Sequence, residues 1–588
     1  MRRVESYRQK KTSPESDAMI GKRPAQNPLF DVGNVFDLKL DPKSFHAQLA
    51  AAAPKLFKDE DFAVFYKDKM GRPSVPPSWL ALATLLQHEA GVSDEEAINR
   101  TAFDLRWCAV LGREAGQPLC AKSTFQLFRA HLVLHPEVTT IFQASLKEAR
   151  RTGLLKGEPL KIALDTKPIR GRGAVQDTFN LLASGIRQLG RVLAQQQGKK
   201  PNDFFAEEGL DRYTHDSVKG SADLDWSDEE AKNALLTQIV ADARRLLAQA
   251  SASVPSVGAA ASLLEQLLLQ DVEVKETDKG EQAIVKEGTA KGRMPSATDP
   301  DVRHGRKSAS KRFNGHKADV AVDQDSQLIV AFAVIAGDAG DASGALHLVE
   351  AAEENTGLTV IETIADCAYG GGPTRAQFAE AGRTLLAKVP KEVSRNGLFV
   401  KSDFDIDLQN DRVRCPAGKT STTFSTLPGG AKTFTFGSAC ADCPLRSACT
   451  TSQSGRSVSV HPQEARLREA RAYQKTPEGK ARLRERVVVE HRLARLGQLG
   501  IGQARYRSRL NTRFQLMLAS SLANFRWIWN VEAGRGPISG SLASLLRSSR
   551  VLRDCLRLSL ALLWHFMLMT TVRTMIRLPF HLAQRAVA

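Results

Sequence analysis

The sequence has few cysteines and no segment suited to secretion or to crossing a membrane. Eight cysteines in 588 residues are too sparse for a disulfide scaffold, which indicates a reducing compartment. The start, MRRVESYRQKKTSPES, is basic but has no apolar core of a secretory signal peptide. The uncharged stretch 558–572 has 15 residues, short of the roughly 20 that a bilayer requires. We therefore expect a cytoplasmic protein with no membrane partner.

Acidic residues are also in short supply. The chain has 82 Lys and Arg against 65 Asp and Glu, which gives a formal net charge of +17 and a pI near 9.5. Such an excess favours a polyanionic partner, either nucleic acid or an anionic membrane surface. Apolar residues at 42% and charged residues at 25% are typical of a folded globular protein. At about 150 residues per domain, the length predicts three to four units.

Residues 25–150, after a flexible basic start at 1–24, have the pattern of a helical domain. The run WLALATLLQHEAG has apolar residues at helical spacing and ends at Gly91. Ser93 and Glu96 form a predicted capping box for the next helix, and a third helix is expected to begin at Ser123. Two helices around such a turn are compatible with a DNA-binding helix-turn-helix, although the local pattern alone favours a plain helical bundle.

From residue 160 the pattern changes to strands alternating with helices, which predicts a multi-domain α/β protein with a mixed sheet flanked by helices. Its predicted strands are 161–165, 317–323, 328–338, 358–366 and 384–390. The predicted α/β domain comprises 160–171, 301–390 and 464–530. A helical insertion at 172–300 and a cysteine-containing insertion at 391–463 interrupt it, and 531–588 form a linker and an Arg-rich apolar tail.

Half of the cysteines lie within 35 residues and have the spacing of metal ligands. They form C-x24-C-x2-C-x5-C and are Cys415, Cys440, Cys443 and Cys449. Four thiolates, two of them separated by only two residues, suit tetrahedral Zn²⁺. An iron–sulfur cluster needs the same number of ligands and stays open as an alternative. We expect one structural zinc ion in this insertion.

Two predicted strands end in a carboxylate, Asp165 and Asp366, where an acid is otherwise uncommon. On neighbouring strands these acids could hold two divalent ions, and phosphodiester cleavage needs such a centre. A third acid is expected from a helix. Glu490 in RVVVEHRLARL is the candidate, with Arg486 one turn earlier on the same face, whereas the rival Glu485 points away from that face. Hard oxygen ligands favour Mg²⁺ or Mn²⁺.

Basic residues are concentrated on both sides of these acids in the sequence. One group lies within 15 residues directly before the second predicted strand and comprises Arg303, Arg306, Lys307, Lys311, Arg312 and Lys317. Another follows Glu490 and comprises Arg505, Arg507 and Arg509. Residues 501–588 contain 13 Arg, no Lys and two acids, which is more one-sided than a solubilising surface needs. We expect these side chains to contact DNA phosphates, which gives affinity and position but no sequence preference.

Five segments in a fixed order carry a family resemblance. They are KIALDTKPIRG, RHGRKSASKRFNGHKADVAVD, ETIADCAYGG, CPLRSAC and RERVVVEHRLARLGQLGIGQARYRSR. This order resembles bacterial insertion-sequence transposases with an RNase H-like DDE domain. The stretch GRPSVPPSWLALATLLQHEAGVSDEEAINRTAFDLRWCAVLG is similar to the InsH-type domain that precedes such cores. The resemblance covers roughly 25–530 and implies that Asp165, Asp366 and Glu490 are the catalytic acids.

Two positions depart from related cut-and-paste transposases. Those proteins carry a Tyr three residues before the Arg that Arg486 matches, and a Lys seven residues after the Glu. Here these places hold Leu483 and Gly497. The DNA contacts of those two side chains are therefore missing, unless Arg492 or Arg495 substitutes. The tail beyond about residue 533 has no counterpart in the resemblance.

The resemblance implies a DNA transposase that acts on double-stranded DNA at the nucleoid. It would bind the terminal inverted repeats of its element as a homodimer, cut there with two Mg²⁺ or Mn²⁺ ions, and join the 3′ ends to target DNA. Arg486 would contact this DNA, and the helical N-terminal domain would recognise the element ends. Two alternatives stay open: a metal-dependent nuclease without strand transfer, and a zinc-bearing DNA-binding regulator. A membrane-associated protein is suggested only by the tail.

Overall fold

The computed structural model describes residues 20–24, 32–36, 38–66, 73–251, 253–278, 280–308, 310–394 and 396–534. The chain divides into two compact units, Met1–Arg526 and Trp527–Ala588. The basic start as far as residue 19 and the Arg-rich tail beyond residue 534 lie outside the described residues. None of the described helices combines the length and the hydropathy that crossing a bilayer requires.

The N-terminal part is helical, as the sequence predicts. Its main helices are α2 (Phe45–Leu56), α3 (Pro77–Ala90), α4 (Asp94–Phe103), α5 (Leu105–Leu111), α6 (Lys122–Leu134) and α7 (Thr140–Arg151). Helix α3 ends at Gly91, whose φ of 67° is left-handed. Ser93 caps α4 by accepting a hydrogen bond from the Glu96 amide at 3.2 Å, as predicted. The Glu96 side chain instead pairs with Arg100, one turn later on the same helix.

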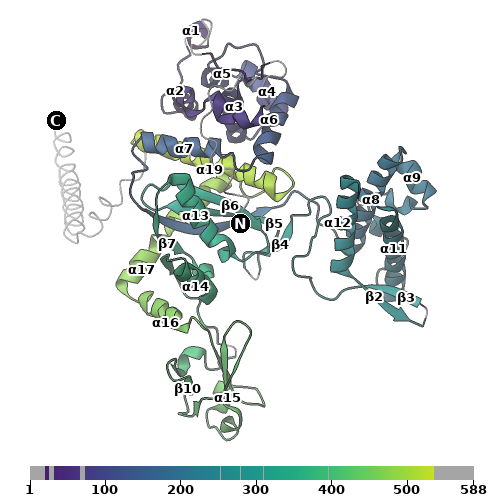
Figure 1. Cartoon of the computed structure of the whole chain (residues 1–588), viewed down its shortest axis with the longest axis vertical. Coiled ribbons are helices and arrows are strands. Elements are labelled where there is room, and N and C mark those ends of the chain that lie inside the picture. Colours follow the sequence, from purple (N-terminus) through teal and green to yellow (C-terminus); the bar gives the residue numbers. More distant parts are fainter. Residues whose placement is uncertain are drawn as a thin grey trace, which may run out of the picture. The chain divides into compact units, whose positions relative to one another are not determined.

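A six-stranded mixed sheet forms the centre of the first unit (Figure 1). Its strands are β1 (Leu160–Arg170), β4 (Arg303–Arg306), β5 (Arg312–Asp323), β6 (Ile329–Ala336), β7 (Val360–Ala365) and β8 (Leu385–Ala387). The order is β4-β5-β1-β7-β8, and β6 also pairs with β5. Strand β5 is antiparallel to β1 and β6, whereas β1, β7 and β8 are parallel. The five predicted strands are confirmed, and β4 is an additional one.

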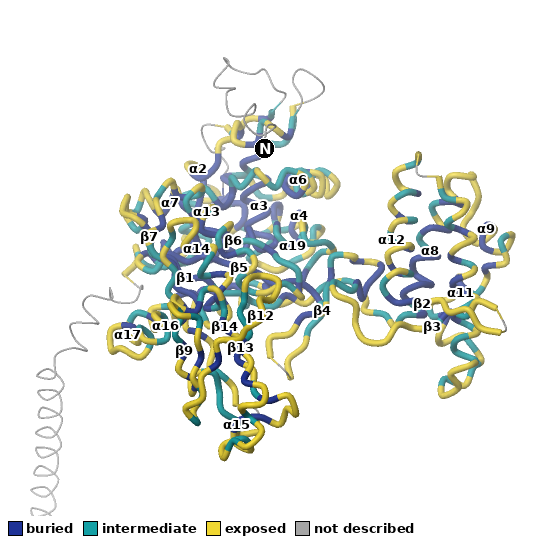
Figure 2. The backbone as a smooth tube through the Cα atoms, turned by 60° about the horizontal axis from the view of Figure 1, so that its bottom comes forward, coloured by how far each residue is buried: buried dark blue, intermediate teal, exposed yellow. Residues whose placement is uncertain are grey.

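The sheet is buried because helices cover it. Figure 2 shows β1, β5 and β6 mostly in the colour of buried residues, which fits their apolar sequences. Helix α13 (Ala345–Thr356) packs on β5 and β6, and α18 (Val487–Gln498) packs on β1 and β5. Helix α19 (Arg509–Glu532) is tied to β6 by the buried Asn524, whose amide bonds both the N–H and the C=O of Ile329 at 2.9 Å.

The segment between β1 and β4 has its own hydrophobic core. Helices α8 (Thr178–Gln196), α11 (Glu229–Gln249) and α12 (Pro255–Asp271) carry most of it. Residue 185 is a glycine because α12 passes close by: a Cβ at Gly185 would lie 2.9 Å from Leu264 Cδ1. This segment was predicted to be helical. It also contains a β-hairpin formed by β2 (Val272–Thr277) and β3 (Gly280–Val285), which the sequence analysis missed.

The cysteine-containing segment folds into two three-stranded sheets. One comprises β9 (Asp405–Asp407), β10 (Arg412–Arg414) and β11 (Thr420–Ser421), and the other β12 (Phe424–Thr426), β13 (Lys432–Thr435) and β14 (Ser457–Val460). Phe404, Val413, Phe434 and Val458 are buried between them, with Cys415 and Cys440 packed against this core. The short helix α15 (Arg446–Cys449) carries the last of the four cysteines.

Candidate active site

Asp165 and Asp366 lie at the same edge of the central sheet. Strands β1 and β7 are parallel, and their last registered pair is Ala163 with Ile364. Asp165 lies two residues after Ala163, and Asp366 lies two residues after Ile364. Asp366 stands just beyond β7, where its carboxylate accepts a hydrogen bond from the Ala368 amide at 2.8 Å and caps the short helix η5 (Cys367–Tyr369). The prediction that the fourth predicted strand lies beside the first is confirmed.

Asp165 does not end its strand, which corrects the sequence analysis. Strand β1 continues to Arg170 because β5 pairs with it as far as the couple Arg170 and Gly315. The sequence analysis ended the strand at Asp165 because it identified strands by runs of apolar residues, and the sequence directly after Asp165 is polar. Asp165 therefore lies in the middle of a long strand, at the point where its neighbour β7 ends.

Arg486 links Asp165 with Glu490. The segment that follows the cysteine insertion forms α16 (Glu464–Tyr473), α17 (Pro477–Arg484) and α18, and Arg486 is the residue before α18. Its guanidinium donates one hydrogen bond to Asp165 Oδ2 at 3.0 Å and a second to Glu490 Oε1. Arg486 and Asp165 are mostly buried, whereas about half of the Glu490 side chain is exposed. One cation therefore stands between two of the three predicted acids.

The three acids influence one another electrostatically. Burial raises the pKa of Asp165, and the negative charges of Asp366 and Glu490 raise it further. The Thr166 amide and the Arg486 guanidinium act in the opposite direction. The rival acid Glu485 is bound elsewhere, because Arg482 pairs with both Glu485 and Glu362. Glu490, and not Glu485, is therefore the acid that shares the Arg486 guanidinium with Asp165.

The oxygen donors suit a hard divalent cation, but the side chains are not arranged as a finished metal site. Within the described residues, no group of three or more His, Cys, Asp or Glu side chains has an arrangement that could hold a metal ion. Arg486 already satisfies oxygens of Asp165 and Glu490. A cation bound by Asp165, Asp366 and Glu490 would therefore share the Asp165 and Glu490 carboxylates with this guanidinium.

A second group of charges lies on the other face of the sheet. The sequence analysis missed its acids and predicted Lys317 as a DNA contact, whereas Lys317 is buried and paired within the protein. Asp319 on β5 is fully buried opposite Thr166, and Tyr369 Oη lies 3.4 Å from its Oδ1. Burial, with the nearby charges of Asp341 and Asp165, raises the pKa of Asp319 to about 8. Lys317, also on β5, pairs with Asp341 at 2.7 Å. The sequence did contain a signal for this group: Lys317 and Asp319 are charged residues at alternate positions of an otherwise apolar strand.

The β4–β5 hairpin presents exposed cations. Arg306 stands opposite Arg312 in the register, and Lys307 and Lys311 follow at the turn. These four side chains are exposed, whereas Arg303 donates hydrogen bonds to the carbonyls of Pro300 and Val302. A pocket of about 800 Å³ lies along this hairpin. Its lining includes Arg306, Arg312, Lys317, Asp341 and Ala368.

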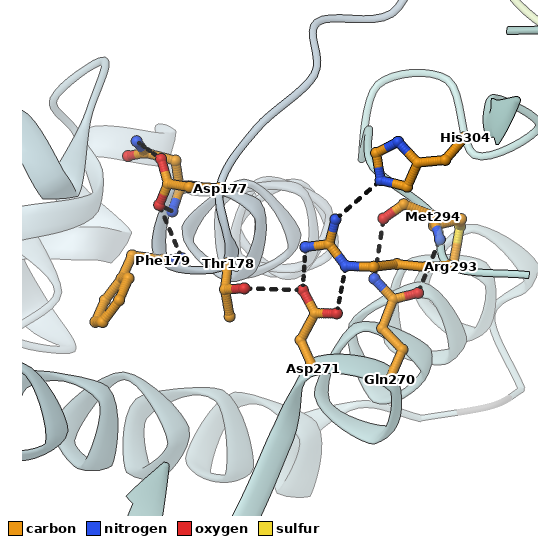
Figure 3. A network of polar contacts seen from close by, with 9 residues as sticks. Asp177, Thr178, Phe179, Gln270, Asp271, Arg293, Met294 and His304 are labelled. Carbon is orange, nitrogen blue, oxygen red and sulfur yellow. Dashed lines mark hydrogen bonds and ion pairs between the residues drawn. The ribbon is translucent and has the colours of Figure 1, made fainter. Parts of the chain in front are cut away.

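One lining residue of this pocket, Ala368, follows Asp366 by two residues and donates its amide N–H to the Asp366 carboxylate. A polar network anchors the hairpin to the helical insertion (Figure 3). Arg293 pairs with Asp271, which also accepts a hydrogen bond from Thr178 at 3.1 Å. Arg293 also lies 3.2 Å from His304 Nε2. His304 Nδ1 in turn lies 2.6 Å from Asn314 Oδ1.

The predicted second basic group is mostly engaged within the protein. Arg505 bonds the carbonyl oxygen of Val92 and stands over the Tyr506 ring. The amide of Arg509 bonds Asp301 at 2.8 Å, and its guanidinium lies 3.7 Å from the same carboxylate. Arg507 is exposed. Of these three predicted DNA contacts, Arg507 is the one whose side chain is not committed to another described residue.

The four clustered cysteines are brought together. Cys415, Cys440, Cys443 and Cys449 all line one small, largely enclosed pocket. Burial raises the pKa of Cys449, and the neighbouring charges of Cys440, Cys415 and Cys443 raise it further. The Arg456 amide donates a hydrogen bond to Cys440 Sγ at 3.4 Å. The four thiols are free and line the same pocket. Within the described residues, their side chains are not arranged as a finished metal site.

Two family models match the chain. The model described as "Transposase DDE domain" matches residues 414–529, which include Arg486 and Glu490. The model described as "Transposase domain (DUF772)" matches residues 34–131, in the N-terminal helical part. No curated protein and no solved structure matches the chain. Two separate transposase models in the expected order confirm the resemblance to DDE transposases of the insertion-sequence type.

Proposed function

We propose that the chain binds the terminal inverted repeats of its own insertion sequence, cleaves phosphodiester bonds there and joins the 3′ ends to target DNA. The observation that carries this proposal is the Arg486 bridge between Asp165 and Glu490, beside Asp366 at the same sheet edge. The strand order supports an RNase H-like fold for the catalytic domain, because an antiparallel pair flanks three parallel strands. Both matched family models are transposase domains.

Asp165, Asp366 and Glu490 would hold two Mg²⁺ or Mn²⁺ ions. Such ions activate the attacking water or hydroxyl and stabilise the leaving oxygen in phosphodiester cleavage. The chain's own residues prepare this chemistry. Arg486 keeps two of the acids together through its guanidinium. Once displaced from them, the same side chain can bond a DNA phosphate, because a guanidinium suits phosphate oxygens as well as carboxylates.

The DNA backbone would lie along the basic hairpin and its pocket. The cations of this surface are Arg306, Lys307, Lys311 and Arg312, with Arg303 at its base. The pocket extends from them to Ala368, whose amide bonds the Asp366 carboxylate, and this supports a DNA path from the hairpin towards Asp366. Phosphate contacts of this kind position DNA without reading its sequence. Recognition of the inverted repeats is assigned to the N-terminal helical part.

The remaining parts have supporting roles in this proposal. The convergence of Cys415, Cys440, Cys443 and Cys449 on one pocket supports a structural Zn²⁺. The ion would brace a segment whose sheets have only a small core. The protein would act as a homodimer, since two element ends must be held together, and would work on DNA in the cytoplasm and at the nucleoid.

The test is incubation of the full chain with a labelled duplex that carries the element's end, unlabelled target DNA and Mg²⁺. The proposal predicts nicking at the element end, followed by transfer of label to target-sized products. Cleavage without transfer would indicate a nuclease on this fold. End-specific binding with no cleavage in Mg²⁺ or Mn²⁺ would indicate a DNA-binding regulator. Either of these outcomes contradicts the proposal.

A further inference from the structure

Strand β1 carries a second charged side chain on the face of Asp165. Side chains alternate along a strand, so Lys167 projects to the same side as Asp165 and lies about 6.6 Å further along. In the register with β5, Asp165 stands opposite Val320 and Lys167 opposite Ala318. Helix α18 packs on β1 and β5. Lys167 therefore extends between strand β1 and the helix that carries Glu490.

The ammonium group of Lys167 is half-buried and has no partner in the part of the chain that the structure describes. No hydrogen bond or ion pair joins it to another described residue. Partly buried cations normally pair with a carboxylate, because removing charge from water is unfavourable. Asp165, on the same face, is engaged by Arg486 instead. An unpaired cation beside a cluster of acids fits an anionic ligand that bridges the two.

Helix α18 follows β1 closely, and contacts at three levels show this. Arg486, at the start of the helix, bonds Asp165. Gly497, near its end, faces Lys167: a Cβ built on Gly497 would lie 3.2 Å from Lys167 Nζ and 3.3 Å from its Cε. Beyond the helix, the Arg170 amide bonds the Gly502 carbonyl oxygen at 3.0 Å. Helix and strand thus run side by side, and the missing side chain at position 497 leaves room for the ammonium group.

Gly497 follows Glu490 by seven residues, which is two helical turns and therefore the same face of α18. The two arginines that could have placed a cation here are occupied. Arg492 is only 8% exposed, and Arg495 donates a hydrogen bond to the Gln498 side chain at 2.8 Å. The positive charge beside Gly497 therefore comes from Lys167 on strand β1 and not from an arginine of α18.

We propose that Lys167 binds a phosphate of the DNA strand held at the acids, and that Gly497 is the residue that makes room for it. The inference rests on the proposed function and adds a residue to its DNA-binding surface. Lys167 would act as a point charge on a non-bridging phosphate oxygen, in the manner usual for lysine. It would position the strand relative to Asp165 without taking part in bond cleavage.

The first test compares Lys167→Ala with Lys156→Ala, an exposed lysine shortly before β1 that gives the same change in net charge. Binding of each full-length variant to a labelled element-end duplex is measured without divalent ions over a range of salt concentrations. Loss of one phosphate contact lowers the slope of log K against log salt by about 0.9 in magnitude. We expect this change for Lys167→Ala and not for Lys156→Ala. An unchanged slope for Lys167→Ala would overturn the inference.

The second test moves the charge from the strand to the helix. Gly497→Lys alone should impair end binding, because its side chain meets the Lys167 ammonium group. In the Lys167→Ala background, Gly497→Lys should restore the slope of log K against log salt. It should also restore at least part of the cleavage of element-end DNA that Lys167→Ala loses. If the double variant neither binds nor cleaves better than Lys167→Ala, the two lysines do not place their ammonium groups at the same position, and the inference about Gly497 is wrong.

These results are distinguishable from failure of the proposed function. If the wild-type chain neither binds nor cleaves element-end DNA, the proposed function itself falls. If the wild type does both and Lys167→Ala behaves like wild type in slope and cleavage, only the role of Lys167 is rejected. The thermal midpoint of each variant, measured alongside, shows whether a loss of binding merely reflects unfolding.

Discussion

Arg486 donates a hydrogen bond to Asp165 at 3.0 Å across 321 residues of sequence, and the same guanidinium pairs with Glu490 on its own helix. This contact joins the last of the five segments that carry the resemblance to strand β1, which holds the first of them. It also places a positive charge where the proposed function requires metal ions. In the free protein this guanidinium occupies one oxygen each of Asp165 and Glu490, and it holds these two acids together without ions.

Replacing Arg486 should have opposite effects on metal binding and on DNA cleavage. In Arg486→Gln the guanidinium no longer competes for the Asp165 and Glu490 oxygens, so we expect Mn²⁺ to bind more tightly in the absence of DNA. Cleavage should nevertheless fall by about a hundredfold or more, because a charge that stabilises the reacting phosphate is lost. Calorimetric titration with Mn²⁺ and a cleavage assay measure the two effects. Weaker Mn²⁺ binding by the variant would show that Arg486 supports the ion site instead of competing for it.

Asp319 should make the folded protein lose stability as the pH rises from about 4 to about 8. Its pKa is raised from the usual 3.8 to about 8, chiefly by burial. Between about pH 4 and pH 8 the folded protein keeps a proton that the unfolded chain has released, so the free energy of unfolding falls as the pH rises. The steepest slope is about 1.4 kcal/mol per pH unit.

Asp319→Asn removes this dependence and keeps the shape of the side chain. The free energy of unfolding of the variant, minus that of the wild type, should therefore grow from pH 4 to pH 8. Denaturant titrations at several pH values measure this difference. A difference that stays constant with pH would mean that Asp319 is ionised in the folded protein.

The basic hairpin should contribute phosphate contacts in proportion to its exposed cations. Arg312→Ala is expected to lower the magnitude of the salt slope by about 0.9 on duplex DNA. Lys156→Ala serves as the matched control, because Lys156 is an exposed cation outside the hairpin and its loss should leave the slope unchanged. Equal slopes for Arg312→Ala and the wild type would place the DNA away from this hairpin.

The cysteine segment should lose its structure together with its metal. Elemental analysis is expected to find one zinc per chain in the wild type and none in Cys443→Ser. Residues 391–463 of that variant should become sensitive to protease, since a structural zinc ion contributes directly to folding. Cys367→Ser, at an exposed free cysteine outside this segment, should keep its zinc. Absence of both zinc and iron from the wild type would end the metal assignment.

The sequence predicts the apolar framework better than its polar additions. The runs that form β5, β6 and β7 are apolar enough to be recognised, and Asp366 directly follows one of them. Strand β4, with the sequence RHGR, and the end of β1 beyond Asp165 are polar, and they form strands because β5 offers hydrogen-bonding partners. Such pairing depends on the tertiary fold and leaves no periodic signal in the sequence.

The candidate site divides in the same way. The spacing of Arg486 and Glu490 on one helix predicts their contact, which depends only on helical geometry. The fate of Arg505 could not be predicted, because its partner, the Val92 carbonyl, lies 413 residues away in the sequence. Lys167 was overlooked for the same reason: its significance depends on Gly497 of a helix that packs against its strand.

The most direct test of the account is cleavage of labelled element-end DNA by variants of the acids that preserve their shape. Asp165→Asn, Asp366→Asn and Glu490→Gln should each abolish cleavage in Mg²⁺ while they retain binding to the end duplex. Glu485→Gln should cleave like the wild type, because Glu485 pairs with Arg482 away from the site. Wild-type cleavage by any of the first three variants, or loss of cleavage in Glu485→Gln, would contradict the proposed centre.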